Sequence, residues 1–196
     1  MIKSLTEHIS YKLIKNKIID DEEQEFYKYG LELLICKCIF YIVVLLISLI
    51  THTFLLSLIF TTLYLSLRQY TGGYHCKTAG GCLVFSTVIY LLMLFHNHVS
   101  IGNEKSAIII LSVISFIILF IFAPDESENN PLTAQERKKY RNRSIALSAL
   151  YLASVTIGCA TGCFFLYFPE FWSLTADAVL IILSKKGGEK HEEYRS

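Results

Sequence analysis

The side chains most suited to chemistry gather in one stretch, "RQYTGGYHCKTAGGC", residues 68–82. It contains four glycines, one histidine and two cysteines between two strongly apolar runs. Three kinds of structure would produce this composition: a turn between helices, a metal site, or a thiol active site in which a histidine activates a cysteine. The neighbouring sequence has to decide among them.

His75 and Cys82 have the side chains of a base and a nucleophile. On one straight helix their seven-residue spacing gives the same face but about 10 Å of axial separation, too far for a thiol to meet an imidazole. The pairs Gly72–Gly73 and Gly80–Gly81 allow the backbone to fold and bring the two side chains together. If a helix begins near Cys82, its unpaired N–H groups and dipole would favour a thiolate there.

Attack on a peptide carbonyl requires a thiolate, and a cysteine of pKa about 8.5 stays mostly protonated at neutral pH unless its surroundings stabilise the anion. Cys76 is a rival nucleophile, but it lies beside His75 rather than at the expected helix start. A metal site of His75, Cys76 and Cys82 is less favoured, because adjacent residues rarely point at one ion and no fourth ligand is near. We therefore expect neither a metal nor another cofactor.

The composition predicts an all-α, polytopic transmembrane helical bundle. The 196 residues are 53% hydrophobic with mean hydropathy +0.46, and only 18% are charged, against about a quarter in soluble domains. Membrane lipids are therefore expected partners. The net charge of +1 provides no basic field for nucleic acid, so no nucleic-acid partner is expected. The charged N-terminal residues do not resemble a removable signal peptide, and internal spans are expected to insert the chain.

About six spans are expected. The nearly continuous apolar run from 35 to 67 would be roughly 50 Å long as one helix, against a hydrocarbon core of about 30 Å, so it must fold back at Thr51–Thr53. The last span is short and carries Asp177, so it could instead be re-entrant or interfacial. The expected spans are 35–51, 53–67, 80–97, 106–123, 144–168 and 171–184.

We expect residues 1–196 to form a single integral membrane domain, with a bundle at 35–184 and a cytoplasmic tail at 185–196. Residues 1–34 would be a cytoplasmic or interfacial segment. Its apolar residues recur every three to five positions with lysines between them, which predicts an amphipathic helix on the membrane surface. A solvated helix packed on the rest of the protein is the alternative. The apolar positions are Ile2, Leu5, Ile9, Leu13 and Ile18.

Positive charge predicts the orientation. With a cytoplasmic N-terminus and six spans, Lys105 is the only one of the 18 Lys and Arg residues on the outer side. Both termini and the stretch that carries His75 and Cys82 then face the cytoplasm.

Three further features have alternative interpretations. His96 and His98 could bind a metal, but polar residues near lipid headgroups are the simpler interpretation. Gly158 and Gly162 have the spacing that lets helices approach closely, within one chain or between two. Asp177 is either functional, because buried carboxylates are costly, or close enough to a helix end to reach water.

The chief alternative to a thiol enzyme is a transporter or export component. A third possibility is a non-enzymatic membrane partner or sensor. In a transporter, the glycine-rich stretch would be a re-entrant loop and Asp177 a charge on the transport pathway.

Residues 68–82 resemble the signature of the accessory gene regulator B family, membrane cysteine peptidases that process quorum-sensing peptide precursors in Gram-positive bacteria. A second segment, "APDESENNPLTAQERKKYR" at 123–141, is similar to the family's loop of proline, acidic residues and a basic run. Chain length and the order of apolar spans also agree, so the resemblance covers nearly the whole chain.

The resemblance implies that Cys82 is the nucleophile and His75 its general base. Cys82 would cleave the precursor after the future signal and retain that signal as a thioester. A thiol or hydroxyl in the precursor would then close a thiolactone or lactone ring. The partners that it implies are an AgrD-like precursor of the autoinducing peptide and a second copy of the chain in a homodimer.

The resemblance also implies roles that rest on position alone. Arg68, Gly72, Gly73 and Tyr74 align with the family motif and would shape or charge the site; Arg68 could hold a precursor carboxylate. Lys138 and Lys139 could attract an acidic precursor tail. Basic residues on a cytoplasmic loop also serve as a topology signal, which is the alternative interpretation.

Overall fold

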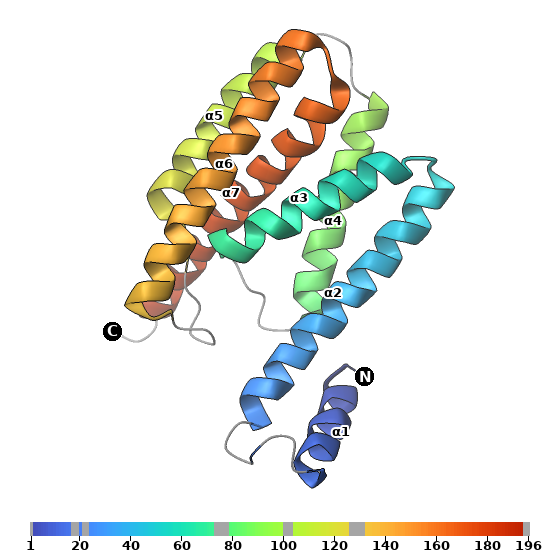
Figure 1. Ribbon diagram of the computed structural model, residues 1–196, viewed down its shortest axis with the longest axis vertical. Coiled ribbons are helices and arrows are strands. Elements are labelled where there is room, and N and C mark those ends of the chain that lie inside the picture. The colour runs from blue at the N-terminus through green and yellow to red at the C-terminus, as the bar shows by residue number, and fades with distance from the viewer. Residues whose placement is uncertain are drawn as a thin grey trace. The chain divides into compact units, whose positions relative to one another are not determined.

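The computed structural model describes residues 2–16, 20, 24–72, 79–99, 104–125 and 132–193. Within these residues every regular element is an α-helix, which confirms the predicted all-α class (Figure 1). Helices suit apolar segments because they pair all their interior backbone groups without water. The helices are α1 (Ile2–Lys15), α2 (Gln24–Ile50), α3 (Phe54–Thr71), α4 (Ala79–Val99), α5 (Lys105–Phe122), α6 (Ala134–Thr161) and α7 (Phe164–Glu193).

Five helical segments of the described chain are long and apolar enough to cross a membrane, which indicates a multi-pass membrane protein. They are Gly30–Ile50, Gly80–Val99, Lys105–Phe122, Ala134–Thr161 and Phe164–Lys185. The helix α3, the second expected span, is not among them, because its 18 residues include a polar last turn that starts at Arg68. The prediction of about six spans is consistent with this set together with α3.

The expected boundary of the fifth span was wrong. Helix α6 ends at Thr161, and Gly162 caps it in the left-handed conformation, with φ 75° and ψ 13°. Glycine adopts this conformation at low cost because it has no Cβ, and it commonly ends helices. The segment 171–184 is neither short nor re-entrant, since it lies inside the 30-residue helix α7.

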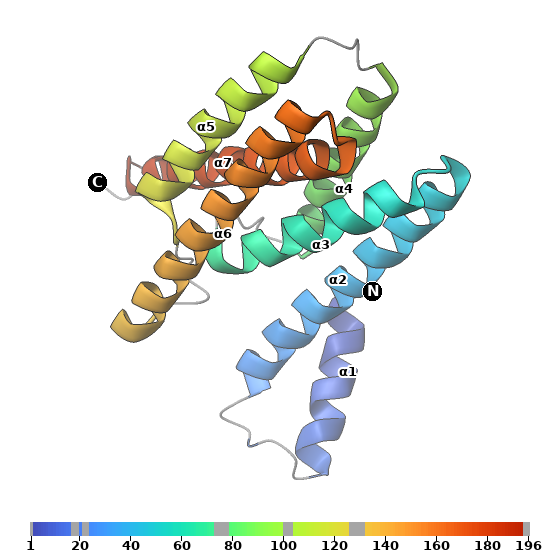
Figure 2. The same ribbon diagram turned by 45° about the horizontal axis from the view of Figure 1, so that its top comes forward.

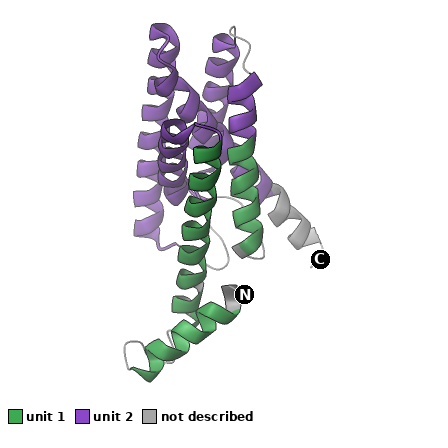
Figure 3. Cartoon of the chain, turned by 90° about the vertical axis from the view of Figure 1, so that its right-hand side faces the viewer, with its two compact units in different colours: residues 1–50, 76–91 green, residues 51–75, 92–196 purple. Residues whose placement is uncertain are grey.

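The chain divides into two compact units, coloured separately in Figure 3. The first comprises residues 1–50 and 76–91, with α1, α2 and the beginning of α4. One stripe of α2 is buried at four-residue intervals: Cys36, Phe40, Val44 and Ser48. Tyr90 of α4 is buried as well, and its hydroxyl donates to the Val44 carbonyl at 3.5 Å. Tyr90 of α4 and Val44 of α2 therefore meet at one point of this stripe.

Helix α1 packs on α2 through small polar side chains. Thr6 and Ser10 are completely buried, whereas Leu5 and Tyr11 are 50% and 61% exposed. The predicted helix is confirmed for Ile2–Lys15, whereas Ile18 lies outside the described residues. Part of the apolar face of α1 stays open, as an interfacial helix requires. Its position at a membrane surface stays a prediction.

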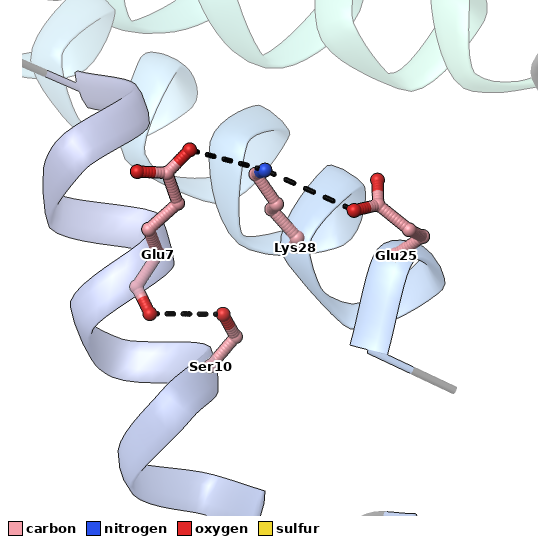
Figure 4. A network of polar contacts seen from close by, with 4 residues as sticks. All are labelled: Glu7, Ser10, Glu25 and Lys28. Carbon is pink, nitrogen blue, oxygen red and sulfur yellow. Dashed lines mark hydrogen bonds and ion pairs between the residues drawn. The ribbon is translucent and has the colours of Figure 1, made fainter. Parts of the chain in front are cut away.

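An ion-pair network also joins α1 to α2 (Figure 4). The Lys28 ammonium lies 3.2 Å from the Glu7 carboxylate and 3.9 Å from that of Glu25. The hydrogen bond to Glu7 raises the pKa of Lys28. One turn along α1, the Ser10 hydroxyl donates to the Glu7 carbonyl at 3.1 Å, so it has a partner within its own helix.

The second unit, residues 51–75 and 92–196, is built around α7. This helix contacts α3, α5 and α6, and Figures 1 and 2 show α5, α6 and α7 side by side. Its spanning window is 61% buried, compared with at most 33% in the other four candidate spans, so α7 is the central helix. The main core cluster contains Leu67, Leu119, Ala123, Tyr151, Leu174, Ala178 and Ile181. Because Leu67 belongs to it, this core supports the end of α3.

The close approach predicted for Gly158 is confirmed within the chain. A Cβ on Gly158 would lie 2.7 Å from the backbone carbonyl carbon of Leu166, so α6 and the start of α7 meet backbone to backbone. Gly162 is used differently, as the cap of α6. The glycine spacing is thus accounted for without a second copy of the chain.

Candidate active site

The described structure contains the two ends of the glycine-rich stretch. Arg68 to Gly72 form the last turn and the cap of α3, and Cys82 lies in the first turn of α4. Gly73, Tyr74 and His75 lie outside the described residues, as does the rival nucleophile Cys76. The meeting of His75 with Cys82 therefore stays a prediction.

Cys82 occupies the kind of position that activation requires. Helix α4 begins at Ala79, close to the expected start, so Cys82 is its fourth residue. Side chains tilt toward the N-terminus of their helix, which directs the thiol toward the positive end of the α4 dipole. This positive end favours a thiolate. The side chain is partly buried.

Arg68 pairs with a buried carboxylate. Its Nη1 lies 3.8 Å from Oδ1 of Asp177 on α7, and the same nitrogen donates to the Gly72 carbonyl at 3.5 Å. Asp177 is fully buried, and neither oxygen has a hydrogen-bond partner among the described residues. A buried carboxylate in an apolar bundle needs an opposite charge nearby, and Arg68 supplies it. The alternative in which Asp177 reaches water is therefore wrong.

Gly72 brings the two sequence motifs together. It adopts φ 68° and ψ −131° at the end of α3, and a Cβ there would overlap the backbone carbonyl oxygen of Asp125. The Asp125 N–H donates to the Thr71 carbonyl at 2.9 Å. Asp125 belongs to the second motif, so the beginning of one motif lies directly against the beginning of the other. Only glycine fits this contact without displacement.

The Asp125 side chain is held by α7 as well. Its Oδ1 lies 2.7 Å from Nζ of Lys185, and the carboxylate side chain is only 5% exposed. We refer to Arg68, Gly72, Asp125, Asp177 and Lys185 as the α3-end cluster. Helix α7 contributes two of its members.

The beginning of α6 also contacts the end of α3. Nη1 of Arg143 donates to the Tyr70 hydroxyl at 3.0 Å, and its guanidinium carbon lies 5.3 Å from the Tyr70 ring centroid. Tyr140 packs edge-on against the same ring. Lys138 and Lys139 are exposed on this part of α6, where they are accessible to a charged ligand.

The sequence predicts that Arg68 and Gly72 shape the site, and it did not single out their neighbours Asp125 and Lys185. The signal for Asp177 was present, since it is a carboxylate inside an apolar segment, but its partner could not be read from the sequence. Asp125 was inside the second motif, where it was one of several acidic residues.

His96 and His98 lie at the opposite end of α4 from Cys82. The Trp172 indole N–H donates to Nδ1 of His96 at 3.0 Å, and Nε2 lies 2.6 Å from Oε2 of Glu104. A neutral imidazole with its proton on Nε2 satisfies both contacts. Both ring nitrogens of His96 thus have protein partners, while His98 is exposed. Within the described part of the chain, no group of three or more potential metal-ligating side chains occurs.

Known proteins match nearly the whole chain. The model of the family described as accessory gene regulator B, AgrB, matches residues 6–183. A protein of Clostridium perfringens (strain SM101 / Type A) is 28% identical over 190 residues, which cover 93% of this chain and 86% of its own length. One of Listeria monocytogenes (serotype 4a, strain HCC23) is 31% identical over 158 residues, 78% of this chain and 76% of its own. Both are named as AgrB-like. No solved structure matches the chain.

Proposed function

Because the chain belongs to the accessory gene regulator B family, we propose that it is a membrane cysteine endopeptidase that processes the precursor of an autoinducing peptide. Family membership supports a role related to quorum sensing, and the apolar helices indicate a multi-pass membrane protein. The observation that carries the specific proposal is the placement of Cys82. This cysteine lies in the first turn of α4, as the last residue of the stretch that resembles the family signature.

In the first step, His75 takes the thiol proton and the Cys82 thiolate attacks the scissile carbonyl carbon of the precursor. The positive end of the α4 dipole also favours the negative charge of the oxyanion in the tetrahedral intermediate. The carbon–nitrogen bond then breaks. The tail leaves as an amine that takes its proton from His75, and the signal part stays on Cys82 as a thioester.

In the second step, a thiol or hydroxyl within the precursor attacks the thioester carbonyl. His75 accepts the proton of that nucleophile, Cys82 leaves as a thiolate, and a thiolactone or lactone ring closes. Water would give a linear product instead. A site that limits water and holds the internal nucleophile close favours cyclisation through a high effective concentration.

Arg68, Gly72, Gly73 and Tyr74 shape the site in this proposal. For Arg68 and Gly72, their contacts at the end of α3 support such a role. Lys138 and Lys139 are exposed on α6, and they attract the acidic tail of the precursor.

The proposal includes location and assembly. Both termini and the His75/Cys82 site face the cytoplasm, where a newly made AgrD-like precursor arrives. The orientation rests on the distribution of Lys and Arg. The active form is a homodimer, an inference from the family resemblance; Gly158 gives it no support, because its close contact is made within the chain.

Co-expression with the cognate precursor, followed by mass measurement of the released tail, tests the proposal. Cys82→Ala and His75→Ala should abolish release. The matched controls Cys163→Ala and His98→Ala remove exposed residues outside the glycine-rich stretch and should retain it. Normal release by Cys82→Ala would refute the peptidase. Undiminished physiological activity of Cys82→Ser would favour the transporter alternative.

A further inference from the structure

Helix α7 offers two charged side chains to the end of α3 from one face. Asp177 and Lys185 are eight residues apart, which places them on the same side of the helix with about 12 Å between them along its axis. Asp177 lies against Arg68, and Lys185 lies against Asp125, whose backbone contacts Thr71. The last turn of α3 is therefore held at two points from α7.

The two anchors differ in how they are solvated. The Asp177 side chain is fully buried, and that of Arg68 is 13% exposed, so water screens this pair little. Lys185 is 51% exposed at its side chain. Both pairs thus contain a buried carboxylate, and water screens Arg68 less than it screens Lys185.

The constraint extends from Arg68 to the glycine-rich stretch. Nη1 of Arg68 reaches both Asp177 and the carbonyl of Gly72. Gly72 is the cap of α3, and the chain runs from there to His75 in three residues. Because Asp177 holds the Arg68 side chain, Arg68 in turn holds the Gly72 carbonyl. The contact therefore sets the position at which the chain leaves α3.

We propose that Asp177 is a positioning residue of the candidate peptidase site and acts through Arg68. It holds the guanidinium against the Gly72 carbonyl, and so sets the starting point of the segment that carries His75. This inference rests on the proposed peptidase function. It assigns Arg68 to a carboxylate of its own chain, instead of to a carboxylate of the precursor.

The two assignments of Arg68 predict different kinetics. If Asp177 positions the base through Arg68, Asp177→Asn and Arg68→Gln should each lower kcat for tail release with little change in KM, by about 10- to 100-fold. If Arg68 binds the precursor instead, Arg68→Gln should raise KM and Asp177→Asn should leave kcat unchanged. The second result would overturn the proposal.

A double-mutant cycle tests whether Asp177 acts through Arg68. The variant Arg68→Gln/Asp177→Asn leaves no uncompensated buried charge from the pair, so it should fold even if a single variant does not. We expect its kcat to equal that of Arg68→Gln alone, because the two residues act as one unit. If the kcat of the double variant falls by the product of the two single-variant losses, the residues act independently and the coupling is refuted. Full activity in the double variant would also refute it.

The rate at which Cys82 reacts with a small maleimide, in variants without the other cysteines, checks that α4 is intact. It should stay within about twofold of the parent in the double variant, because the proposed displacement concerns the end of α3; a larger change would overturn this local role. Cys82→Ala separates the two claims. Tail release by Cys82→Ala would refute the peptidase itself, whereas full kcat in Asp177→Asn, with release still dependent on Cys82, would refute only the positioning role.

Discussion

Gly72→Ala should disrupt the end of α3. The residue has φ 68° and ψ −131°, a conformation that costs other residues on the order of 1–3 kcal/mol. The new Cβ would overlap the Asp125 carbonyl oxygen and lie 3.1 Å from its carbon. Because this neighbour is backbone, relief requires displacing the segment, at about 1–3 kcal/mol for overpacking. We expect a destabilisation of about 2–6 kcal/mol from the two effects.

Thermal unfolding of the purified protein in detergent, followed by size-exclusion chromatography, measures this effect. Gly30→Ala is the matched control, since Gly30 is exposed inside α2 and has nothing within 4 Å of an added Cβ. Alanine there should stabilise the helix by about 0.5–1 kcal/mol. Gly80→Ala is a second control for stability, because an added Cβ meets open space there too.

Gly72→Ala should therefore melt well below the parent protein, and both controls at or slightly above it. Tail release should fall with it, because the displaced segment leads to His75. An unchanged melting temperature in Gly72→Ala would show that the contact between the two motifs does not constrain the chain, and would refute the reasoning.

Three other substitutions test separate contacts by the same melting measurement. Lys185→Met should cost at least about 1–3 kcal/mol, because it leaves the Asp125 carboxylate, which is 5% exposed, without its charged partner; no loss of stability would contradict the importance of this pair. Thr133→Ala removes the capping box that begins α6 and should cost about 1 kcal/mol, and no change would mean that the cap is unimportant. Gly158→Ala should cost about 1–3 kcal/mol through overlap with the Leu166 backbone, so a variant as stable as the parent would exclude that close contact.

Much of the fold could be predicted from the sequence because apolar run lengths are set by the membrane. The helix start near Cys82 and the break at Thr51–Thr53 were both found in this way. The boundary between α6 and α7 was missed because residues on both sides of Gly162 are apolar. A single left-handed residue ends α6 there, and hydropathy contains no signal for it.

Only the local features of the candidate site could be predicted from the sequence. The motif around Cys82 and the helix that begins before it follow from local sequence. The pairing of Arg68 with Asp177 does not, because it depends on how α7 packs against α3. The same holds for Asp125 and Lys185, whose contact joins distant segments. Local patterns identify which charges are unusual, whereas tertiary packing decides which charges meet.

Direct detection of the acyl-enzyme is the sharpest test of the central claim that Cys82 is the nucleophile of a precursor-processing peptidase. The precursor should carry alanine in place of its internal thiol or hydroxyl nucleophile, so that ring closure cannot remove the thioester. Intact-protein mass spectrometry should then show a hydroxylamine-sensitive adduct with the mass of the signal part, located on Cys82. Tail release without any adduct on Cys82, or an adduct that persists in Cys82→Ala, would contradict the account.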